Sequence, residues 1–315
     1  MAIYRILTLD GGGIRGIFSA RLLARLSAAV PGFLDTVDLF AGTSTGGILA
    51  LGLAAGITPA ELAELYRING PNIFDDSWLD NLRDLGNLAG AQYDNRKLRR
   101  VLQRVFEQEH HVVMLDDLLP KKVLVPTFDL DDSDDPRRKA GKPRSWKPKF
   151  FHNYPGPDSD GQERIVDVAM RTSAAPTYFP AADGYIDGGV VVNNPAMSAL
   201  AQAINDQTGG RSLADLRLFS LGTGYNPTFI AGRNLDWGFG QWARPLIGLM
   251  IDGVMGVADY QCRQLLGERQ YHRLDCMLPT VIALDEYRKV GDLVRFADEL
   301  DLGETIEWLQ TSFAA

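Results

Sequence analysis

Hydrophobic and polar positions follow two alternating patterns along the chain. Short apolar runs typical of buried strands cover residues 4–9, 37–41, 122–128, 148–153, 184–187 and 216–221. Apolar residues at helical spacing predict helices over residues 16–29, 44–55, 58–68, 94–107, 163–173 and 195–206. Strands that alternate with helices in this order predict an α/β fold, with a mostly parallel central sheet covered by helices on both faces.

A longer amphipathic pattern occurs in the last third of the chain. Over residues 237–260 an apolar residue recurs every four positions, at Trp242, Leu246, Met250, Val254 and Ala258. This spacing predicts a helix, and packing in the core is its first interpretation. The alternative is a lid or interfacial helix, because its glycines lower helix stability and its tryptophans and methionines suit contact with lipid.

A charged segment separates two of the predicted strands. Residues 129–149 contain a run of aspartates followed by a run of arginines and lysines. We interpret this segment as a solvated hairpin loop whose charges compensate one another. The alternative is a mobile flap over the entrance of a site.

Ser44 is the candidate nucleophile of this chain. It stands in Gly42-Thr43-Ser44-Thr45-Gly46, between a predicted strand and a predicted helix. A G-x-S-x-G sequence in that context is the nucleophile elbow of serine hydrolases. Gly42 and Gly46 are expected where the turn is so tight that a side chain at either flank would clash.

A glycine-rich loop follows the first predicted strand and leads into the first predicted helix. It contains Gly11, Gly12, Gly13 and Arg15. A bend that opens a helix presents unpaired backbone N–H groups and therefore binds anions. In an acyl hydrolase that anion is the oxyanion of the tetrahedral intermediate. Arg15 either adds positive charge near the loop or fixes its shape.

Asp187 is the candidate acid–base residue. It begins Asp187-Gly188-Gly189, where two small residues leave room for a serine to approach. A catalytic triad would need a histidine after the acid, in the order Ser, Asp, His. Only His272 follows Asp187, and it stands in a polar stretch that we interpret as surface. The sequence thus favours a Ser-Asp dyad.

The same glycine loop also fits a dinucleotide-binding fingerprint, since Gly16 completes a G-x-G-x-x-G pattern. That motif expects an acidic residue at the end of the second strand, to bind the ribose. Asp35 and Asp38 have the right offset but lie before or at the start of that strand, whose end carries Ser44. Asp10 would also repel a pyrophosphate. A dinucleotide-binding protein is therefore the disfavoured alternative.

Taken in order, these motifs resemble the patatin-like phospholipase family. The family's oxyanion loop matches Gly11 to Gly13 with Arg15, its nucleophile matches Ser44, and its D-G-G motif matches Asp187. The matches run from about residue 4 to about residue 196. The resemblance implies a single patatin-like domain over residues 1–315 with a three-layer α/β/α fold.

The resemblance also implies an activity. A Ser44–Asp187 dyad would cleave fatty acyl esters of glycerophospholipids through an acyl-enzyme, as a phospholipase A-type enzyme does. Neither a metal nor a cofactor is implied for this chemistry. The expected substrate is a phospholipid or another acyl lipid.

Composition and charge restrict the partners. The chain has 315 residues, 45% hydrophobic and 23% charged, as in soluble globular proteins. A net charge of −8 argues against a nucleic acid polymer as partner and against membrane binding through a basic patch. Neither a transmembrane segment nor a signal peptide is predicted, and Cys262 and Cys276 are interpreted as free thiols. We expect a cytoplasmic protein that contacts the membrane surface transiently, through apolar groups.

Residues 225–315 match no motif that we can place. They could supply a lid, a regulatory ligand site or an oligomer interface. Some bacterial relatives in the family are controlled by small molecules. The alternative to a constitutive hydrolase is therefore the same domain acting as a ligand-activated, membrane-degrading effector, with a small-molecule activator and a homo-oligomer among its partners.

Overall fold

The computed structural model describes residues 3–73, 95–134, 141, 143–232 and 235–314. Its strands are β1 (Tyr4–Leu9), β2 (Leu39–Gly42), β3 (Lys122–Asp129), β4 (Lys147–His152), β5 (Tyr185–Asp187), β6 (Leu216–Leu221) and β7 (Tyr271–Leu274). Its α-helices are α1 (Gly16–Ala29), α2 (Thr45–Ala54), α3 (Pro59–Ile73), α4 (Asn95–Leu102), α5 (Ile165–Thr172), α6 (Ala196–Ile204), α7 (Phe239–Leu265), α8 (Val290–Glu299) and α9 (Gly303–Trp308).

These strands form one sheet in the order β4-β3-β2-β1-β6-β7, with β5 also paired to β3. Strands β1, β2, β3, β6 and β7 run parallel, whereas β4 and β5 run antiparallel to β3. The predicted mostly parallel sheet is confirmed. Strand β7 was not predicted, because Tyr271-His272-Arg273-Leu274 contains no apolar run.

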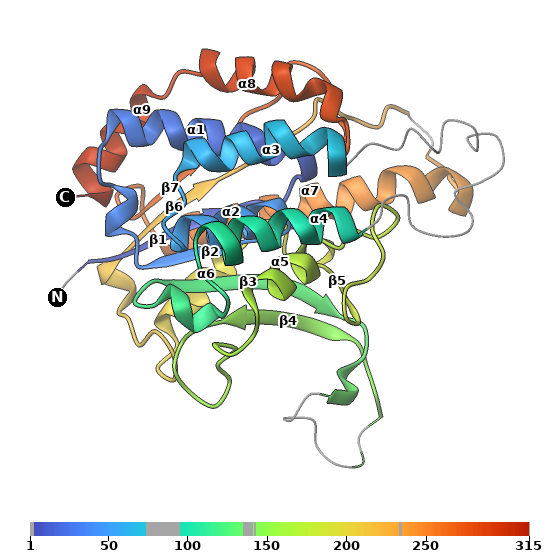
Figure 1. Ribbon diagram of the computed structural model, residues 1–315. Coiled ribbons are helices and arrows are strands. Elements are labelled where there is room, and N and C mark those ends of the chain that lie inside the picture. The colour runs from blue at the N-terminus through green and yellow to red at the C-terminus, as the bar shows by residue number, and fades with distance from the viewer. Residues whose placement is uncertain (1–2, 74–94, 135–140, 142, 233–234, 315) are drawn as a thin grey trace.

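Side chains of β1 alternate between two hydrophobic cores, one on each face of the sheet. Leu7 and Leu9 belong to a core that includes residues of α1, α2 and α3. Ile6 belongs to the other core, which includes residues of α6 and α7. Helices therefore cover both faces of the sheet (Figure 1), which confirms the three-layer α/β/α architecture.

Helix α7 confirms the predicted helix and extends it to Leu265, but Met250, which belongs to the predicted apolar stripe, is 53% exposed. Met255, Ala258 and Cys262 are buried, at helical spacing, on the face that packs against the body. Val257 and Tyr260 are exposed on other faces of the same helix. Among the side chains of α7 that the structure describes, core packing thus accounts for one narrow stripe.

The charged segment after β3 belongs to a hairpin, since β3 and β4 pair antiparallel. Arg144 forms an ion pair with Asp131 across the base of the loop. Compensating charges therefore occur there, as expected. The tip, which the flap hypothesis concerns, includes residues 135–140 and 142 and lies outside the described residues.

The last third of the chain packs against the same sheet and helices as the first two thirds. Strand β7 extends the sheet next to β6, and α8 packs on α1. Arg21 of α1 forms an ion pair with Asp298 of α8 at 2.6 Å. Within the described residues, no helix has the length and apolar character needed to cross a membrane.

Candidate active site

Ser44 lies in a strained turn between β2 and α2. Its φ of 56° and ψ of −125° place it in a region that residues with a Cβ rarely adopt. Its backbone N–H donates to the Thr172 hydroxyl at 2.9 Å, and that hydroxyl donates to the Pro126 carbonyl at 2.7 Å. Residues outside the turn thus stabilise its conformation. Ser44 lies at the N-terminus of α2, where the helix dipole favours negative charge.

The glycines of the elbow are required by close backbone contacts. A Cβ on Gly42 would lie 2.0 Å from the carbonyl oxygen of Gly46. A Cβ on Gly46 would lie 2.2 Å from the carbonyl oxygen of Leu9. Both distances are far below contact distance, so the steric reason that the sequence suggested for these two glycines is present in the fold.

The register of β3 explains how Asp187 comes to lie beside Ser44. Residues 124–129 of β3 pair with β4 along one edge, so β2 and β5 must share the other edge. Residues 122–124 of β3 pair with β2, and residues 127–129 pair with β5. Asp187, opposite Thr127, therefore lies in line with β2, just beyond the end that leads to Ser44.

The two side chains are in direct contact. The Ser44 hydroxyl donates to Asp187 Oδ2 at 2.5 Å, and the Gly189 N–H donates to Asp187 Oδ1 at 2.7 Å. Burial raises the pKa of the Asp187 carboxyl to about 6, although both hydrogen bonds oppose the rise. A carboxyl with that pKa is mostly ionised at neutral pH and can accept a proton and return it.

The glycine loop lies against the elbow, and one of its three N–H groups is already used. A Cβ on Gly11 would be 3.3 Å from the Ser44 Cβ, but the Gly11 N–H donates to the Asn193 carbonyl at 3.0 Å. Within the described residues, the N–H groups of Gly12 and Gly13 have no hydrogen-bond partner. The expected donor set of three therefore narrows to Gly12 and Gly13.

Glycine is needed at both of those positions. A Cβ on Gly12 would lie 2.3 Å from the hydroxyl oxygen of Thr223. Gly13 has a φ of 57°, and a Cβ there would lie 2.2 Å from the Leu284 carbonyl oxygen. The loop thus threads between the segments that follow β6 and β7, which the sequence alone did not connect to it.

Arg15 is buried beside the loop and supports its shape. Its Nε donates to the Gly12 carbonyl at 3.4 Å. Burial lowers the pKa of its guanidinium, and the nearest charges that oppose this are Asp275, Asp252 and Asp10. Of the two roles that the sequence left open, this contact favours the shaping role.

His272 is not the surface residue that its polar neighbourhood suggested. It lies on β7, its ring stacks on Trp308 at 5.3 Å between centroids, and its Nε2 is hydrogen-bonded to the Thr305 hydroxyl at 2.9 Å. Burial lowers the pKa of this imidazole. These contacts occupy the ring with C-terminal residues, so it plays no part in the contacts of Ser44 and Asp187.

Ser44 and Asp187 open into a largely apolar pocket, which we call the catalytic pocket. Its empty space, including the mouth, is about 1340 Å³. Its polar lining includes the glycine loop and Asn193, and its hydrophobic lining comes from several helices and loops: Ile48, Leu65, Tyr66, Ile73, Leu98, Pro176, Tyr178, Phe179, Val190, Met250, Ile251 and Leu284. A long apolar group can therefore reach the serine.

The chain is similar to known proteins over most of its length. It is 34% identical to a cGAMP-activated phospholipase of Pseudomonas aeruginosa, over 86% of this chain and 78% of the relative. It is 34% identical to a cGAMP-activated phospholipase of Vibrio cholerae, over 75% and 71% respectively. It is also 28% identical to Patatin-like protein 2 of Arabidopsis thaliana, over 91% and 81%. Residues 7–200 match the family described as Patatin-like phospholipase. The chain belongs to the patatin-like phospholipase family.

Proposed function

We propose that this chain is a lipid acyl hydrolase that cleaves fatty acyl esters of glycerophospholipids. The observation that carries the proposal is the 2.5 Å contact between the Ser44 hydroxyl and Asp187, inside a pocket lined by hydrophobic side chains. Family membership and the phospholipase relatives support the substrate class.

In the proposed mechanism, Asp187 accepts the proton of the Ser44 hydroxyl as its oxygen attacks the ester carbonyl. The N–H groups of Gly12 and Gly13 stabilise the oxyanion, assisted by the N-terminus of α2. Asp187 then returns the proton to the leaving alkoxide, which departs as a lysolipid. Water repeats the sequence on the acyl-enzyme and releases the fatty acid.

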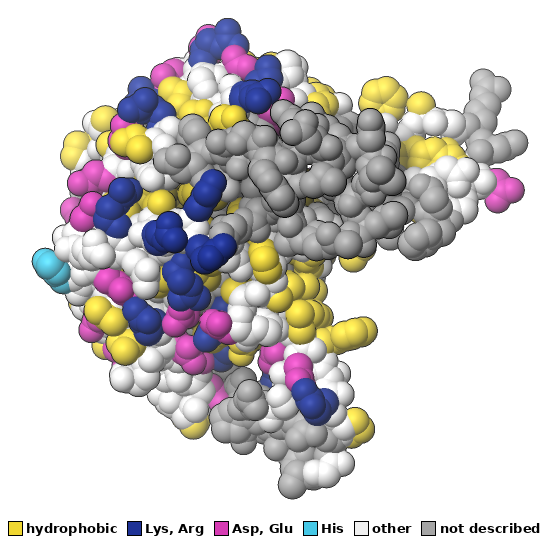
Figure 2. Space-filling view, turned by 45° about the vertical axis from the view of Figure 1, so that its right-hand side comes forward, with side chains coloured by type: hydrophobic (Ala, Val, Ile, Leu, Met, Phe, Trp, Pro, Cys, Tyr) yellow, Lys and Arg dark blue, Asp and Glu magenta, His cyan; other side chains and the backbone are white. Residues whose placement is uncertain are grey.

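Access to lipid is proposed to rely on apolar contact with the membrane surface. Figure 2 shows hydrophobic side chains gathered along the concave right-hand edge of one face. Large hydrophobic side chains are also exposed on α7, among them Met250, which lines the catalytic pocket. Such groups suit a transient contact at a lipid surface.

Product analysis tests this proposal. Mixed phospholipid vesicles are incubated with the wild type, Ser44→Ala and Asp187→Asn, and the lipids are identified by mass spectrometry. We expect lysolipid and free fatty acid from the wild type and at least about 10³-fold less, or none, from either variant. Equal release by Ser44→Ala would refute the proposed nucleophile.

A second proposed function is activation by a nucleotide. Two relatives carry the name cGAMP-activated phospholipase. The observation in this chain that favours regulation is a second pocket built by residues of the C-terminal third, one of which, Arg273, forms an ion pair with Asp10, the residue before the glycine loop. The active site and the regulatory site would then lie in a single domain. The homo-oligomer stays a prediction.

A further inference from the structure

The proposed mechanism leaves Asn193, a buried polar side chain of the catalytic pocket, without a role. Asn193 lines this pocket and is only 4% exposed. It lies in the segment that follows Asp187, and the elbow holds that segment, because the Thr43 hydroxyl donates to the Val192 carbonyl at 2.7 Å. Burying an amide side chain costs free energy unless its polar atoms are bonded. The bonds of Asn193 therefore indicate what its side chain contributes.

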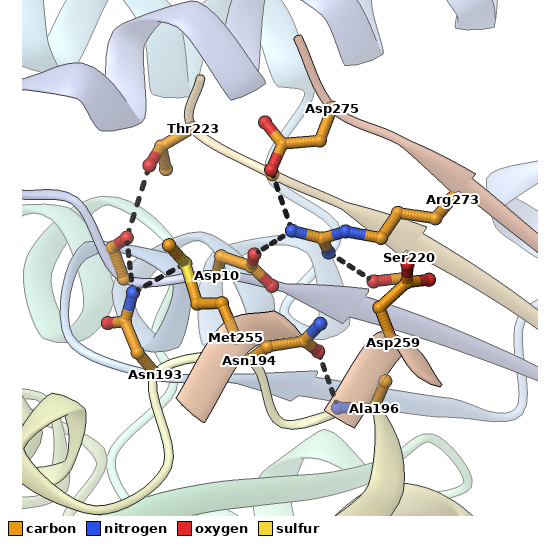
Figure 3. Close-up of polar contacts among 12 residues, drawn as sticks. Asp10, Asn193, Asn194, Ala196, Ser220, Thr223, Met255, Asp259, Arg273 and Asp275 are labelled. Carbon is orange, nitrogen blue, oxygen red and sulfur yellow. Dashed lines mark hydrogen bonds and ion pairs between the residues drawn. The ribbon is translucent and has the colours of Figure 1, made fainter. Parts of the chain in front are cut away.

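Asn193 is bonded to both peptide groups of Gly11, the first glycine of the oxyanion loop. The Gly11 N–H donates to the backbone carbonyl of Asn193 at 3.0 Å, and Asn193 Nδ2 donates to the Gly11 carbonyl at 3.2 Å (Figure 3). The Thr223 hydroxyl donates to the same carbonyl at 3.1 Å. Two side chains, one after Asp187 and one after β6, thus fix the direction of the Gly11 carbonyl.

The direction of this carbonyl determines the direction of a proposed oxyanion donor. The Gly11 carbonyl and the Gly12 N–H belong to one planar trans peptide, so they point to opposite sides of the chain. Hydrogen bonds that hold the carbonyl therefore turn the Gly12 N–H away from Asn193 Nδ2 and from Thr223. In the described part of the chain that N–H has no partner of its own, which leaves it available to a developing oxyanion.

The other atom of the amide, Asn193 Oδ1, lies between the two motifs of the active site. A Cβ on Gly11 would lie 2.2 Å from Asn193 Oδ1, and a Cβ on Gly189 would lie 2.9 Å from the same atom. Gly189 is the residue whose N–H donates to Asp187. One side chain thus fills the space between the loop that bears the oxyanion donors and the segment that orients the base, and it gives a steric reason for a glycine in each.

A bond to α7 fixes the orientation of the amide itself. Besides the Gly11 carbonyl, Asn193 Nδ2 donates to Met255 Sδ at 3.0 Å (Figure 3). Both hydrogens of the amide nitrogen are then used. Rotation of the amide would break both bonds and would place an oxygen against the Gly11 carbonyl, so the side chain has one favourable orientation.

We infer that Asn193 is a positioning residue of the hydrolase: its side chain holds the Gly11 peptide so that the Gly12 N–H faces the oxyanion. This inference rests on the proposed hydrolase, since it concerns the donors of that reaction. Without the Nδ2 donor the peptide between Gly11 and Gly12 can turn over, and its carbonyl would then oppose the developing negative charge.

Two neighbouring asparagines supply a matched pair of variants. Asn193→Asp keeps the shape of the side chain and replaces the donor with an acceptor oxygen. In Asn194, also buried, Oδ1 accepts from the Ala196 N–H at 2.9 Å and Nδ2 has no partner, so Asn194→Asp adds the same charge without removing a bond (Figure 3). With an uncharged ester at about pH 8.5, where Asp187 is ionised, we expect kcat per titrated active site to fall about 10–10²-fold in Asn193→Asp, with KM within about threefold. Asn194→Asp should keep kcat within about threefold.

A thionoester, in which sulfur replaces the carbonyl oxygen, separates positioning from a general loss of structure. Sulfur accepts hydrogen bonds weakly, so oriented N–H donors stabilise an oxygen anion more than a sulfur anion. We expect the ratio of kcat/KM for the ester over the thionoester to fall at least about fivefold in Asn193→Asp. Asn193→Leu, which removes the donor without adding charge, should lower the ratio as much. A variant that merely folds less well loses both activities equally and keeps the ratio.

An unchanged ratio in Asn193→Asp and Asn193→Leu would overturn the inference. Thr223→Val removes the other donor to the Gly11 carbonyl and should lower the ratio at least about twofold; a wild-type ratio there would also count against the inference, whether or not the variants of Asn193 fold. Ser44→Ala is the blank throughout. Loss of Ser44-dependent hydrolysis in the wild type would contradict the proposed hydrolase, whereas Ser44-dependent hydrolysis with unchanged ratios would contradict only the role of Asn193.

Discussion

Burial raises the pKa of two aspartates near the active site, but one has neutral partners and the other has a cationic partner. Asp187 ends β5 and Asp10 follows β1, and burial raises the pKa of each carboxyl to about 6. In the described structure, Asp187 has neutral partners, the Ser44 hydroxyl and the Gly189 N–H. Asp10 instead forms an ion pair with the buried guanidinium of Arg273.

This difference in partners separates a chemical role from a structural one. A carboxylate with neutral partners can take up a proton and release it without leaving another charge unpaired. Protonation of Asp10 would remove one of the two carboxylates that neutralise Arg273. Burial alone therefore does not identify a catalytic acid; the charge of its partner decides.

The largest expected effect comes from Asp187→Asn. The amide keeps the shape of the side chain but cannot accept the serine proton, so kcat should fall by about 10⁴-fold. The control is Asp298→Asn, which removes only a surface ion pair and should keep wild-type kcat. Hydrolysis of a short-chain ester measures kcat of both variants. A fall in kcat of less than about tenfold in Asp187→Asn would contradict the role of Asp187 as the base.

The loop that follows Asp10 should be the next most sensitive position. In Gly12→Ala the new Cβ would lie 2.3 Å from the Thr223 hydroxyl oxygen, so the loop must move. Because a misplaced oxyanion donor costs transition-state stabilisation, we expect kcat to fall by about 10²–10³-fold with little change in KM. Gly253→Ala, with open space around its Cβ, is the control; equal kinetics in the two variants would contradict the assignment.

Stability should change in opposite directions at the two aspartates. Asp10→Asn leaves Arg273 buried with one carboxylate fewer and should lower the free energy of unfolding by about 3 kcal/mol. Asp187→Asn removes a carboxylate that burial disfavours and should raise it by about 1 kcal/mol at pH 7.5. Urea unfolding measures both values, and a loss of stability in Asp187→Asn would contradict the account.

The increase in the free energy of unfolding caused by Asp187→Asn should depend on pH. A carboxyl whose pKa is about 6 in the folded chain, above its ordinary value, stabilises the wild type below the ordinary pKa and loses that contribution as pH rises through about 6. The difference between variant and wild type should therefore shrink as pH falls from 7.5 towards 4. A difference that stays constant over this range would show that Asp187 is not the titrating group.

The smallest expected effect is the pH profile of the wild type. Since Asp187 must be ionised to act as a base, kcat/KM should fall about tenfold for each pH unit below about 6. The pKa of Asp10 is also about 6, but its protonation leaves the contact between Ser44 and Asp187 in place, so it should add no second slope in that range. The profile is measured with an uncharged ester. A slope of two in log(kcat/KM) against pH would indicate that protonation of both carboxyls lowers kcat/KM.

Local patterns were enough to predict most of the fold. Helix α1 has the predicted bounds, and β1 and β6 were predicted to the residue. The elbow and the glycine loop were identified by glycines at positions where a tight turn leaves no room for a side chain. These features depend on neighbours in the sequence, which is why periodicity and turn chemistry reveal them.

Contacts between distant segments could not be predicted in the same way. The Gly11 N–H is bonded to Asn193, 182 residues away, and that bond removes one expected oxyanion donor. Strand β7 lies at the edge of the sheet, and its polar residues gave no strand signal; His272 was therefore assigned to the surface. The contact of Thr172 with the elbow and the ion pairs of Arg273 were missed, because the partners of single polar residues cannot be read from the sequence.

Covalent labelling with a fluorophosphonate tests whether Ser44 is the nucleophile and Asp187 its base. Intact mass and peptide mapping locate the adduct, and the rate is followed from pH 4.5 to 8 in the wild type and Asp187→Asn. We expect one adduct, on Ser44, with a labelling rate that rises through an apparent pKa of about 6 and falls at least about 10³-fold in Asp187→Asn. An adduct on another residue, or equal rates in the two proteins, would contradict it.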